Sequence, residues 1–359
     1  MNFKATLTGY KELFDKELNT LLEEELSRYE NKTVKQNISL LKEYILPGGK
    51  RLRPIAAMMA YKAFSSNEKL MIRPALFIEF FHNYTLIFDD LMDEDDYRRG
   101  REGVQKKLKN IFLSNNNEKR YDGAIFSFAS KRYAASISML LGLICDTLSR
   151  RVIVENQFPD NNKIKALAVL NDLSRIVAEG QLMDIQMESL KEIKEEDYLE
   201  MIQKKTASLF ISAIEIGALF GNADPEQINR LKDYALNIST AFQIQDDILD
   251  ISSELKKGHD LGSDIKKGKR TLLVIKAFER ADEHQKRILL DILGRGNATS
   301  SEVLQVVKIF SETGAKEYCQ NLAEDKIQNG KDMLTKLDLN QESKEFFMQF
   351  ADYMSKRAH

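Results

Sequence analysis

The chain has little of several residue types on which whole classes of protein depend. Of its 359 residues only 2 are cysteines, Cys145 and Cys319, too few for a disulfide framework, which favours a reducing, cytoplasmic environment. It also has only 5 prolines and 17 glycines, which together with long helical periodicities predicts an all-α protein. The 53 basic and 55 acidic residues leave a net charge of -2. This near-neutral balance does not favour nucleic-acid binding.

Long hydrophobic runs are missing as well. The first residues are charged from the start and lack the apolar core of a signal peptide. Apolar runs such as 139–145 are far shorter than a membrane span. We therefore expect a cytoplasmic protein with no membrane span, long enough for one large domain or two ordinary ones.

What the chain does have is a cluster of aspartates at the end of an apolar stretch. The pattern predicts a helix over 70–93, with Gly100 as its stop signal, and Asp89 and Asp93 on one face. Carboxylates in the last turns meet the negative end of the helix dipole, so the cluster costs stability unless cations bind it. Taken alone, it is equally compatible with a solvated acidic helix end. If it holds a cation, oxygen-only ligands indicate Mg²⁺ or Ca²⁺.

A second cluster repeats this arrangement. Asp246, Asp247 and Asp250 also close an apolar helix, with Gln243 three residues before Asp246, and a charged, glycine-rich loop is predicted over 258–269. One such cluster is weak evidence for a site, whereas two of them are strong evidence. In a helix bundle, facing carboxylate clusters predict a cage for a metal-bound polyanion.

Two further motifs contain basic residues. Gly48 and Gly49 lead into Lys50-Arg51-Leu52-Arg53-Pro54, and such a turn offers backbone N–H groups and three cations to a diphosphate. A solvated basic turn is the alternative. The pair Lys205-Thr206 lies in a helix predicted over 197–220 and is a weak motif by itself, since a surface lysine explains it equally well.

These motifs occur together in the order and spacing of a known family. The chain closely resembles the trans-isoprenyl diphosphate synthases (polyprenyl synthetases) over roughly residues 40–280. The resemblance implies a large all-α bundle around a deep central cavity, formed as one domain over 1–359 with helices 281–358 packed around it, and a homodimer. It also implies a Mg²⁺-dependent prenyltransferase that condenses isopentenyl diphosphate with dimethylallyl, geranyl or farnesyl diphosphate.

The resemblance assigns roles residue by residue. The positions that hold isopentenyl diphosphate are matched by Lys50, Arg53, His82 and Arg99. Those around the allylic diphosphate are matched by Arg98, Lys205, Thr206, Gln243 and Lys269. The Mg²⁺ ligands, for a site that takes three ions with substrate bound, are matched by Asp89, Asp93 and Asp246, with Asp90, Asp247 and Asp250 supporting them.

The chain departs from the family at a few places. Many relatives carry a lysine before Gly262 where this chain has His259 and Asp260, so one contact to the allylic diphosphate is expected to be missing. Residues 101–132 follow the family poorly and are predicted to be a surface excursion. No motif carboxylate is lost, which favours an active enzyme over a non-catalytic partner subunit.

Product length is expected to depend on the residues before Asp89. With a rise of about 1.5 Å per residue, Tyr84 lies roughly 7.5 Å and Phe81 roughly 12 Å along the helix from Asp89. In the resembling family, a single aromatic residue five positions before the first aspartate, followed by a small residue, accompanies a C20 product. Here these two residues are Tyr84 and Thr85. We therefore expect geranylgeranyl diphosphate, with farnesyl diphosphate as the alternative, while ordinary core packing would give these side chains no role in length.

Two further classes of protein remain as alternatives. A class I terpene cyclase would share the first cluster, but its second metal motif would differ from Gln243 to Asp250, and it would not need Lys50, Arg53 and His82. A structural helical protein with acidic patches would explain none of the ordered motifs.

Overall fold

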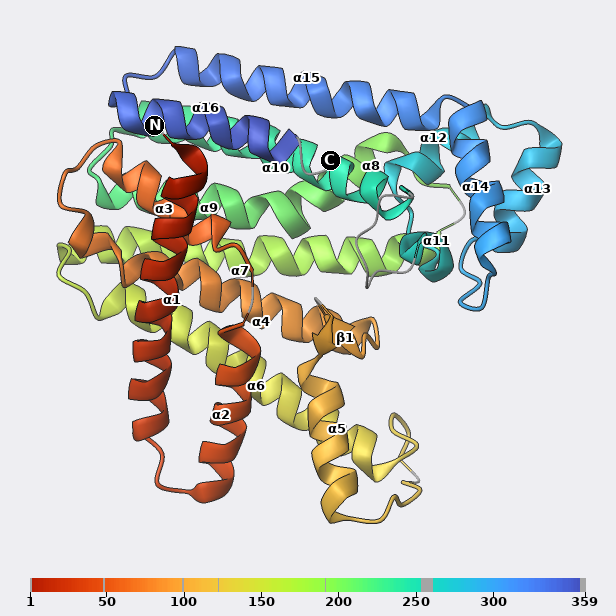
Figure 1. The fold of residues 1–359 in the computed structure, drawn as a ribbon, viewed down its shortest axis with the longest axis horizontal. Coiled ribbons are helices and arrows are strands. Elements are labelled where there is room, and N and C mark those ends of the chain that lie inside the picture. Colours follow the sequence, from red (N-terminus) through yellow and green to blue (C-terminus); the bar gives the residue numbers. More distant parts are fainter. Residues whose placement is uncertain are drawn as a thin grey trace. The chain divides into compact units, whose positions relative to one another are not determined.

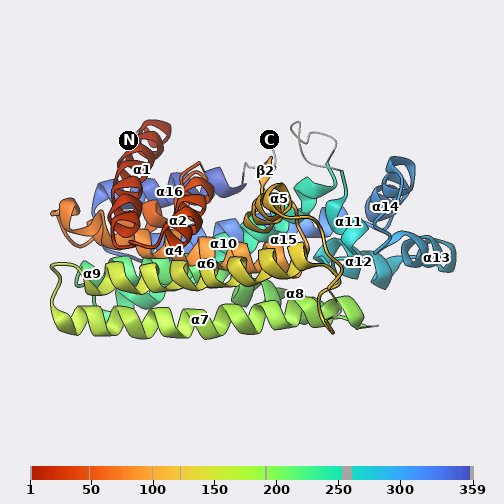
Figure 2. The same ribbon diagram turned by 90° about the horizontal axis from the view of Figure 1, so that it is seen from below.

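The computed structural model describes residues 2–47, 49–98, 100–121, 123–190, 192–252 and 261–355. This part of the chain is almost entirely helical (Figures 1 and 2), which confirms the all-α prediction. Its only strands are β1 (Tyr97–Arg98) and β2 (Arg101–Glu102), which pair as an antiparallel hairpin. The chain forms two compact units: an N-terminal unit (Asn2–Tyr61 and Ser65–Leu167) and a C-terminal unit (Lys62–Phe64 and Ala168 onward).

The N-terminal unit contains the first aspartate cluster. Its helices are α1 (Phe3–Ser27), α2 (Lys32–Ile45), α3 (Leu52–Lys62), the 3₁₀ helices η1 (Glu68–Met71) and η2 (Pro74–Leu76), α4 (Phe77–Met92), α5 (Val104–Asn115) and α6 (Ala129–Val154). Figure 1 shows α1 beside α2 and α4 beside α6, and both pairs are in contact. Phe77, Phe80 and Phe81 of α4 are completely buried. This aromatic packing fixes the helix that ends in the cluster.

The predicted helix over 70–93 was wrong at its start and in its stop signal. Pro74 has no N–H to donate and begins η2, so α4 starts only at Phe77. At the other end Asp93 is the C-cap, Glu94 takes a left-handed φ of 52°, and the Asp95 N–H donates to the Asp90 carbonyl at 2.8 Å. This is a Schellman ending with a glutamate where glycine is usual. Gly100 lies instead in the turn of the hairpin.

The C-terminal unit contains the second cluster. Its helices are the later part of α7 (Asp160–Ser189), α8 (Glu195–Ile202), the π-helix η3 (Gln203–Ala207), α9 (Ser208–Phe220), α10 (Pro225–Asp250), α11 (Ser263–Lys267), α12 (Leu272–Arg280), α13 (Glu283–Ile292), α14 (Ser300–Glu312), α15 (Ala315–Thr335) and α16 (Gln341–Ser355). Figure 1 shows α15 and α16 alongside α10. The rings of Tyr234 in α10 and Phe347 in α16 lie 5.3 Å apart, edge to face. These contacts position the helix whose last turn carries Asp246 and Asp250.

Two expectations for this unit need correction. The helix predicted over 197–220 is interrupted by η3, a π segment that contains Lys205 and Thr206, and such segments are frequent at functional sites. The loop predicted over 258–269 contains the short helix α11, while His259 and Asp260 lie outside the described residues. Within the described ranges no helix has the length and apolar character needed to cross a membrane.

Candidate active site

The first cluster is paired with an arginine that the hairpin turns back toward α4. Arg98 of β1 donates from Nη2 to Asp89 Oδ2 at 3.0 Å and from Nε to Asp90 Oδ1. Asp93 has helical backbone angles, and its N–H donates to the Asp89 carbonyl at 2.9 Å. The four-residue relation that the sequence predicted for Asp89 and Asp93 therefore holds. The arginine supplies the positive charge that the carboxylates need at a helix C-terminus.

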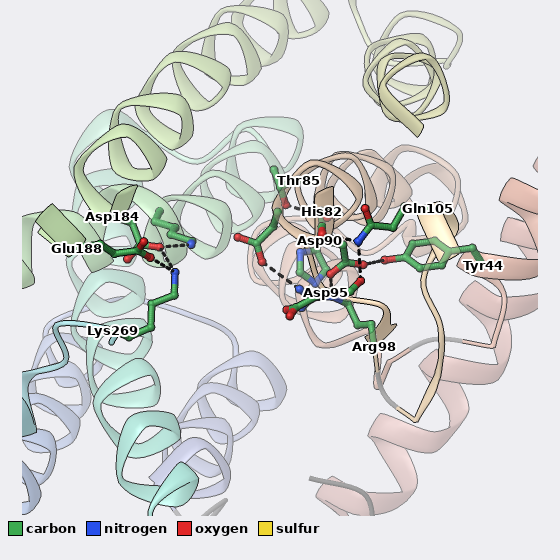
Figure 3. Close-up of polar contacts among 12 residues, drawn as sticks. Tyr44, His82, Thr85, Asp90, Asp95, Arg98, Gln105, Asp184, Glu188 and Lys269 are labelled. Carbon is green, nitrogen blue, oxygen red and sulfur yellow. Dashed lines mark hydrogen bonds and ion pairs between the residues drawn. The ribbon is translucent and has the colours of Figure 1, made fainter. Parts of the chain in front are cut away.

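Asp90 is the buried member of the first cluster. Figure 3 shows it among its polar partners Tyr44, Arg98 and Gln105. Burial raises the pKa of its carboxyl group to about 6, although the charge and hydrogen bond of Arg98 act in the opposite direction. Tyr44 of α2 donates its hydroxyl to Asp90 Oδ2 at 3.2 Å. Gln105 of α5 donates to the backbone carbonyls of Asp90 and Asp95 at 2.8 and 2.9 Å. Sequence reasoning missed Tyr44 and Gln105, because no spacing rule connects them to the cluster.

The basic turn divides into residues with different environments. Lys50 is exposed and Arg53 is partly exposed, whereas Arg51 is buried with a fully covered side chain. The prediction that all three cations face a ligand was therefore wrong for Arg51. His82 lies on α4, where its carbonyl accepts a hydrogen bond from Thr85 Oγ1 at 2.8 Å. Arg99 lies outside the described residues.

The second cluster closes α10, as predicted, but its carboxylates have different partners. Asp247 is buried and accepts hydrogen bonds from Tyr198 Oη at 2.7 Å and from Gln243 Nε2 at 2.9 Å. Asp250 accepts from the backbone N–H groups of Ser263 and Asp264 at 3.2 and 3.1 Å. These bonds fasten the start of α11 to the end of α10.

The electrostatics of the second cluster favour a bound cation. Burial, followed by the charge of Asp264, raises the pKa of Asp247 well above its usual value. Burial, followed by the charges of Asp250 and Asp246, raises the pKa of Asp264 to about 7. Carboxylates that resist ionisation together are the groups that a divalent cation would stabilise in their charged form.

Two of the predicted basic residues bind the same carboxylate, and Figure 3 shows one of them, Lys269, beside Asp184 and Glu188. Lys205 and Lys269 both bind Asp184 Oδ2 of α7, with N–O distances of 2.6 and 3.1 Å, and Lys269 also binds Glu188 at 3.1 Å. Sequence reasoning assigned no role to Asp184. A signal existed one turn earlier, at Gly180. A Cβ there would lie 2.4 Å from the Lys205 backbone nitrogen, so only glycine lets α7 approach η3 this closely.

Two other residues predicted to bind the allylic diphosphate, Thr206 and Gln243, extend this group of contacts. Thr206 donates its hydroxyl to Gln243 Oε1 at 3.1 Å, and Gln243 in turn donates to Asp247. Residues 37 positions apart in the chain are thereby joined to the second cluster. Lys205, Thr206, Gln243 and Lys269, predicted to surround one diphosphate, all belong to this C-terminal group.

The carboxylates of the two clusters are candidate ligands for a metal ion, and their arrangement can be compared with what Mg²⁺ requires. Across the described ranges no three His, Cys, Asp or Glu side chains gather into a ready-made metal cage. Mg²⁺ does not require such a cage, because it keeps several waters and takes one or two carboxylates together with phosphate oxygens. Oxygen-only clusters at two helix ends therefore fit Mg²⁺ that binds together with a diphosphate.

The residues predicted to set product length form an aromatic row on α4. The ring centroids of Phe81 and Tyr84 lie 5.4 Å apart, and those of Tyr84 and Phe88 lie 5.0 Å apart. Phe88, which sequence reasoning missed, packs against Gly142 of α6, where a Cβ would lie only 2.4 Å from the ring. Phe81 is completely buried, whereas Tyr84 and Phe88 are partly exposed.

The chain matches the polyprenyl synthetase family model over residues 35–310. It is 36% identical over 318 residues to a geranylgeranyl diphosphate synthase from Methanosarcina mazei, and the match covers 87% of each chain. It is 34% identical to a short chain isoprenyl diphosphate synthase from Methanothermobacter thermautotrophicus, covering 88% of each chain. Among solved structures, geranylgeranyl pyrophosphate synthetase from Pyrococcus horikoshii is similar, with a TM-score of 0.83, 28% identity, and coverage of 99% of this chain and 100% of the other. The chain therefore belongs to the polyprenyl synthetase family.

Proposed function

We propose that this chain is a short-chain trans-prenyltransferase that condenses isopentenyl diphosphate head-to-tail with an allylic diphosphate. The observation that carries this proposal is the group at Asp184, where Lys205 and Lys269 bind the same carboxylate. Beside it, hydrogen bonds link Thr206 to Gln243 and Gln243 to Asp247. Two ammonium groups and a hydroxyl held around buried carboxylates suit a diphosphate with bound cations. Family membership supports the same activity.

In the proposed reaction the C–O bond of the allylic diphosphate breaks, and the diphosphate leaves with the electron pair. Lys205, Lys269 and Arg98 are proposed to stabilise the negative charge that grows on the departing diphosphate. The double bond of isopentenyl diphosphate then attacks the allylic cation, and the released diphosphate accepts the proton that is lost. Lys50, Arg53, His82 and Arg99 are proposed to hold isopentenyl diphosphate during this attack.

Asp89, Asp93 and Asp246 are proposed to hold Mg²⁺, three ions in all with substrate bound, supported by Asp90, Asp247 and Asp250. Bound Mg²⁺ would neutralise the diphosphate oxygens and so stabilise the leaving group. The aspartates themselves would orient the ions, and Arg98 offsets the mutual repulsion of Asp89 and Asp90 while no diphosphate is bound.

The proposed product is geranylgeranyl diphosphate, with farnesyl diphosphate as the second candidate. Tyr84, which is partly exposed between Phe81 and Phe88, is proposed to limit the growing chain, with Thr85 as the small neighbour. Tyr84→Ala should lengthen the product by one or more isoprene units while turnover remains, because the metal ligands are unchanged. Mass spectrometry of dephosphorylated products from Tyr84→Ala and Phe81→Ala measures this. If both variants make the wild-type length, these residues do not set it.

We further propose that the chain is cytoplasmic and forms a homodimer. The two units of each chain are proposed to belong to one synthase domain. Helix α6 exposes the apolar side chains of Met139, Leu140, Leu143 and Val154. The first three lie within about one helical turn, Val154 lies about three turns further on, and all four share a face, which suits an apolar interface. Both cysteines are free and buried, as is usual in a reducing compartment.

One assay tests the proposed activity. The purified chain is given isopentenyl diphosphate with dimethylallyl, geranyl or farnesyl diphosphate, with Mg²⁺ or with a chelator. Prenyl diphosphates longer than the starter should form only with Mg²⁺. A cyclic hydrocarbon from the allylic substrate alone would indicate a terpene cyclase, and no product from any starter would indicate a non-catalytic subunit.

A further inference from the structure

Arg51 lies between two proposed contacts to isopentenyl diphosphate, yet its own side chain is completely buried. Its backbone has a φ of 53°, in the left-handed region that residues with a Cβ rarely occupy. This conformation sends the Arg51 side chain into the protein between Lys50, which is exposed, and Arg53, which is partly exposed. The turn therefore depends on what Arg51 binds inside.

The Arg51 guanidinium joins three helices of the N-terminal unit. It donates from Nε to Asp15 Oδ1 of α1 at 2.8 Å and from Nη1 to Glu79 Oε1 of α4. Its Nη2 donates to the carbonyls of Ile45 and Leu46 at 3.0 and 2.9 Å, which satisfies acceptors at the end of α2. A lysine could not reproduce these contacts, because its single nitrogen lacks the planar fork of donors.

The same contacts connect the turn with the α4 segment that carries His82. Glu79 precedes His82 by one turn of α4, and Asn83 Nδ2 donates to the Glu79 carbonyl at 2.8 Å and to its Oε1 at 3.2 Å. The Arg51 carbonyl accepts the Ile55 N–H at 3.1 Å, at the start of α3. One side chain thus relates Lys50, Arg53 and His82 to one another.

We propose that Arg51 is the positioning residue of the isopentenyl diphosphate site, and that Asp15 of α1 adjusts the affinity of that site through it. This inference rests on the proposed function, which places isopentenyl diphosphate at Lys50, Arg53 and His82. Helix α1 precedes residues 35–310, the part matched by the family model, so the inference gives a role to a segment outside that match.

Steady-state kinetics with each substrate varied separately test the proposal. Arg51→Met should raise KM for isopentenyl diphosphate about tenfold, and Asp15→Asn about threefold, with KM for the allylic substrate changed by less than about twofold. Arg51→Lys should resemble Arg51→Met, since it keeps the charge and loses the fork. The Kd of isopentenyl diphosphate, measured by calorimetry, should rise by the same factors. Should Arg51→Met fail to fold, Asp15→Asn decides the matter.

Arg73 provides a matched control in the same unit. It also binds two carboxylates of α1, Glu17 at 2.7 Å and Glu24 at 2.7 Å, but these contacts do not involve the basic turn. Arg73→Met should lower Tm and leave KM for isopentenyl diphosphate unchanged. An unchanged KM in Asp15→Asn, or an equal rise in Arg73→Met, overturns the positioning role.

A further variant separates failure of this inference from failure of the proposed function. Arg53→Ala should raise KM for isopentenyl diphosphate far more than KM for the allylic substrate. If Arg53→Ala is selective and the Arg51 and Asp15 variants are not, only the positioning role is wrong. If Arg53→Ala affects both substrates equally, the placement of isopentenyl diphosphate is wrong.

Discussion

The two aspartate clusters look alike in the sequence and differ in how the protein holds them. The first, at the end of α4, is bound by a guanidinium that a short hairpin carries back to Asp89 and Asp90. In the second, at the end of α10, neutral donors hold Asp247, namely the Tyr198 hydroxyl and the Gln243 amide. An arginine offsets carboxylate charge by itself, whereas neutral donors only orient it.

This difference has a consequence for the enzyme without metal. Arg98 keeps the first cluster partly neutralised and so limits the rise in the pKa of Asp90, which is raised to about 6. No arginine pairs with Asp247 or with the neighbouring Asp264 among the contacts described above, and their pKa values are raised well above the usual value and to about 7, respectively. We infer that the second cluster depends more on a bound cation than the first. Each of the following variants tests this contrast.

The largest expected effect is on turnover when either cluster loses its proposed metal ligand. Asp89→Ala and Asp246→Ala should each lower kcat by about 10³-fold or more, as expected for groups that act mainly in the transition state. Both variants should remain folded by circular dichroism, because each removes a repelling carboxylate. A near-wild-type rate in either variant at saturating Mg²⁺ would show that this aspartate is not a ligand.

The free energy of unfolding should distinguish the charged partner of the first cluster, Arg98, from the neutral partners of the second cluster. Arg98→Met should cost about 1–3 kcal/mol at pH 8, less than a fully buried pair because the Arg98 side chain is 25% exposed. The loss should be smaller at pH 5, below the Asp90 pKa of about 6, where the abandoned carboxyl group is protonated. Urea unfolding at both pH values in chelator measures it.

The matched change in the second cluster is Tyr198→Phe, which removes the neutral donor to Asp247. It should cost about 1–2 kcal/mol, the usual effect of a lost buried hydrogen bond. Its cost should change less between pH 5 and pH 8 than the cost of Arg98→Met does, because a neutral hydroxyl interacts less strongly with a carboxylate than a guanidinium does. A pH dependence as strong as that of Arg98→Met would contradict the contrast between the clusters.

The sequence predicted the parts of the site that lie in local patterns. Both aspartate clusters end apolar helices as expected, because four-residue spacing and helix ends are local properties. Tyr44, Asp184 and Tyr198 were missed, because each reaches its partner only through tertiary packing. The end of α4 was misjudged for a related reason, since Glu94 occupies a left-handed position that local rules reserve for glycine.

The smallest expected effect is on the pH dependence of stability without metal. The pKa of Asp264 is raised to about 7 in the folded chain, so its contribution to stability is present at low pH and is lost as the pH rises toward 7. Asp264→Asn should therefore flatten the fall of Tm between pH 4 and pH 7 in chelator. Asp325→Asn, at an exposed position on α15, should leave the wild-type slope unchanged. If Asp264→Asn keeps that slope, Asp264 does not titrate in this range.

The most direct test of the account asks whether both clusters act in the same chemical step. Single-turnover rates of product formation are measured for Asp89→Ala, Asp246→Ala and the double variant at saturating Mg²⁺ and substrates. If both aspartates serve ionisation of the allylic diphosphate, the double variant should be about as slow as the slower single variant, since groups that act as a unit are non-additive. Losses that multiply in the double variant would contradict the claim and assign the two clusters to independent steps.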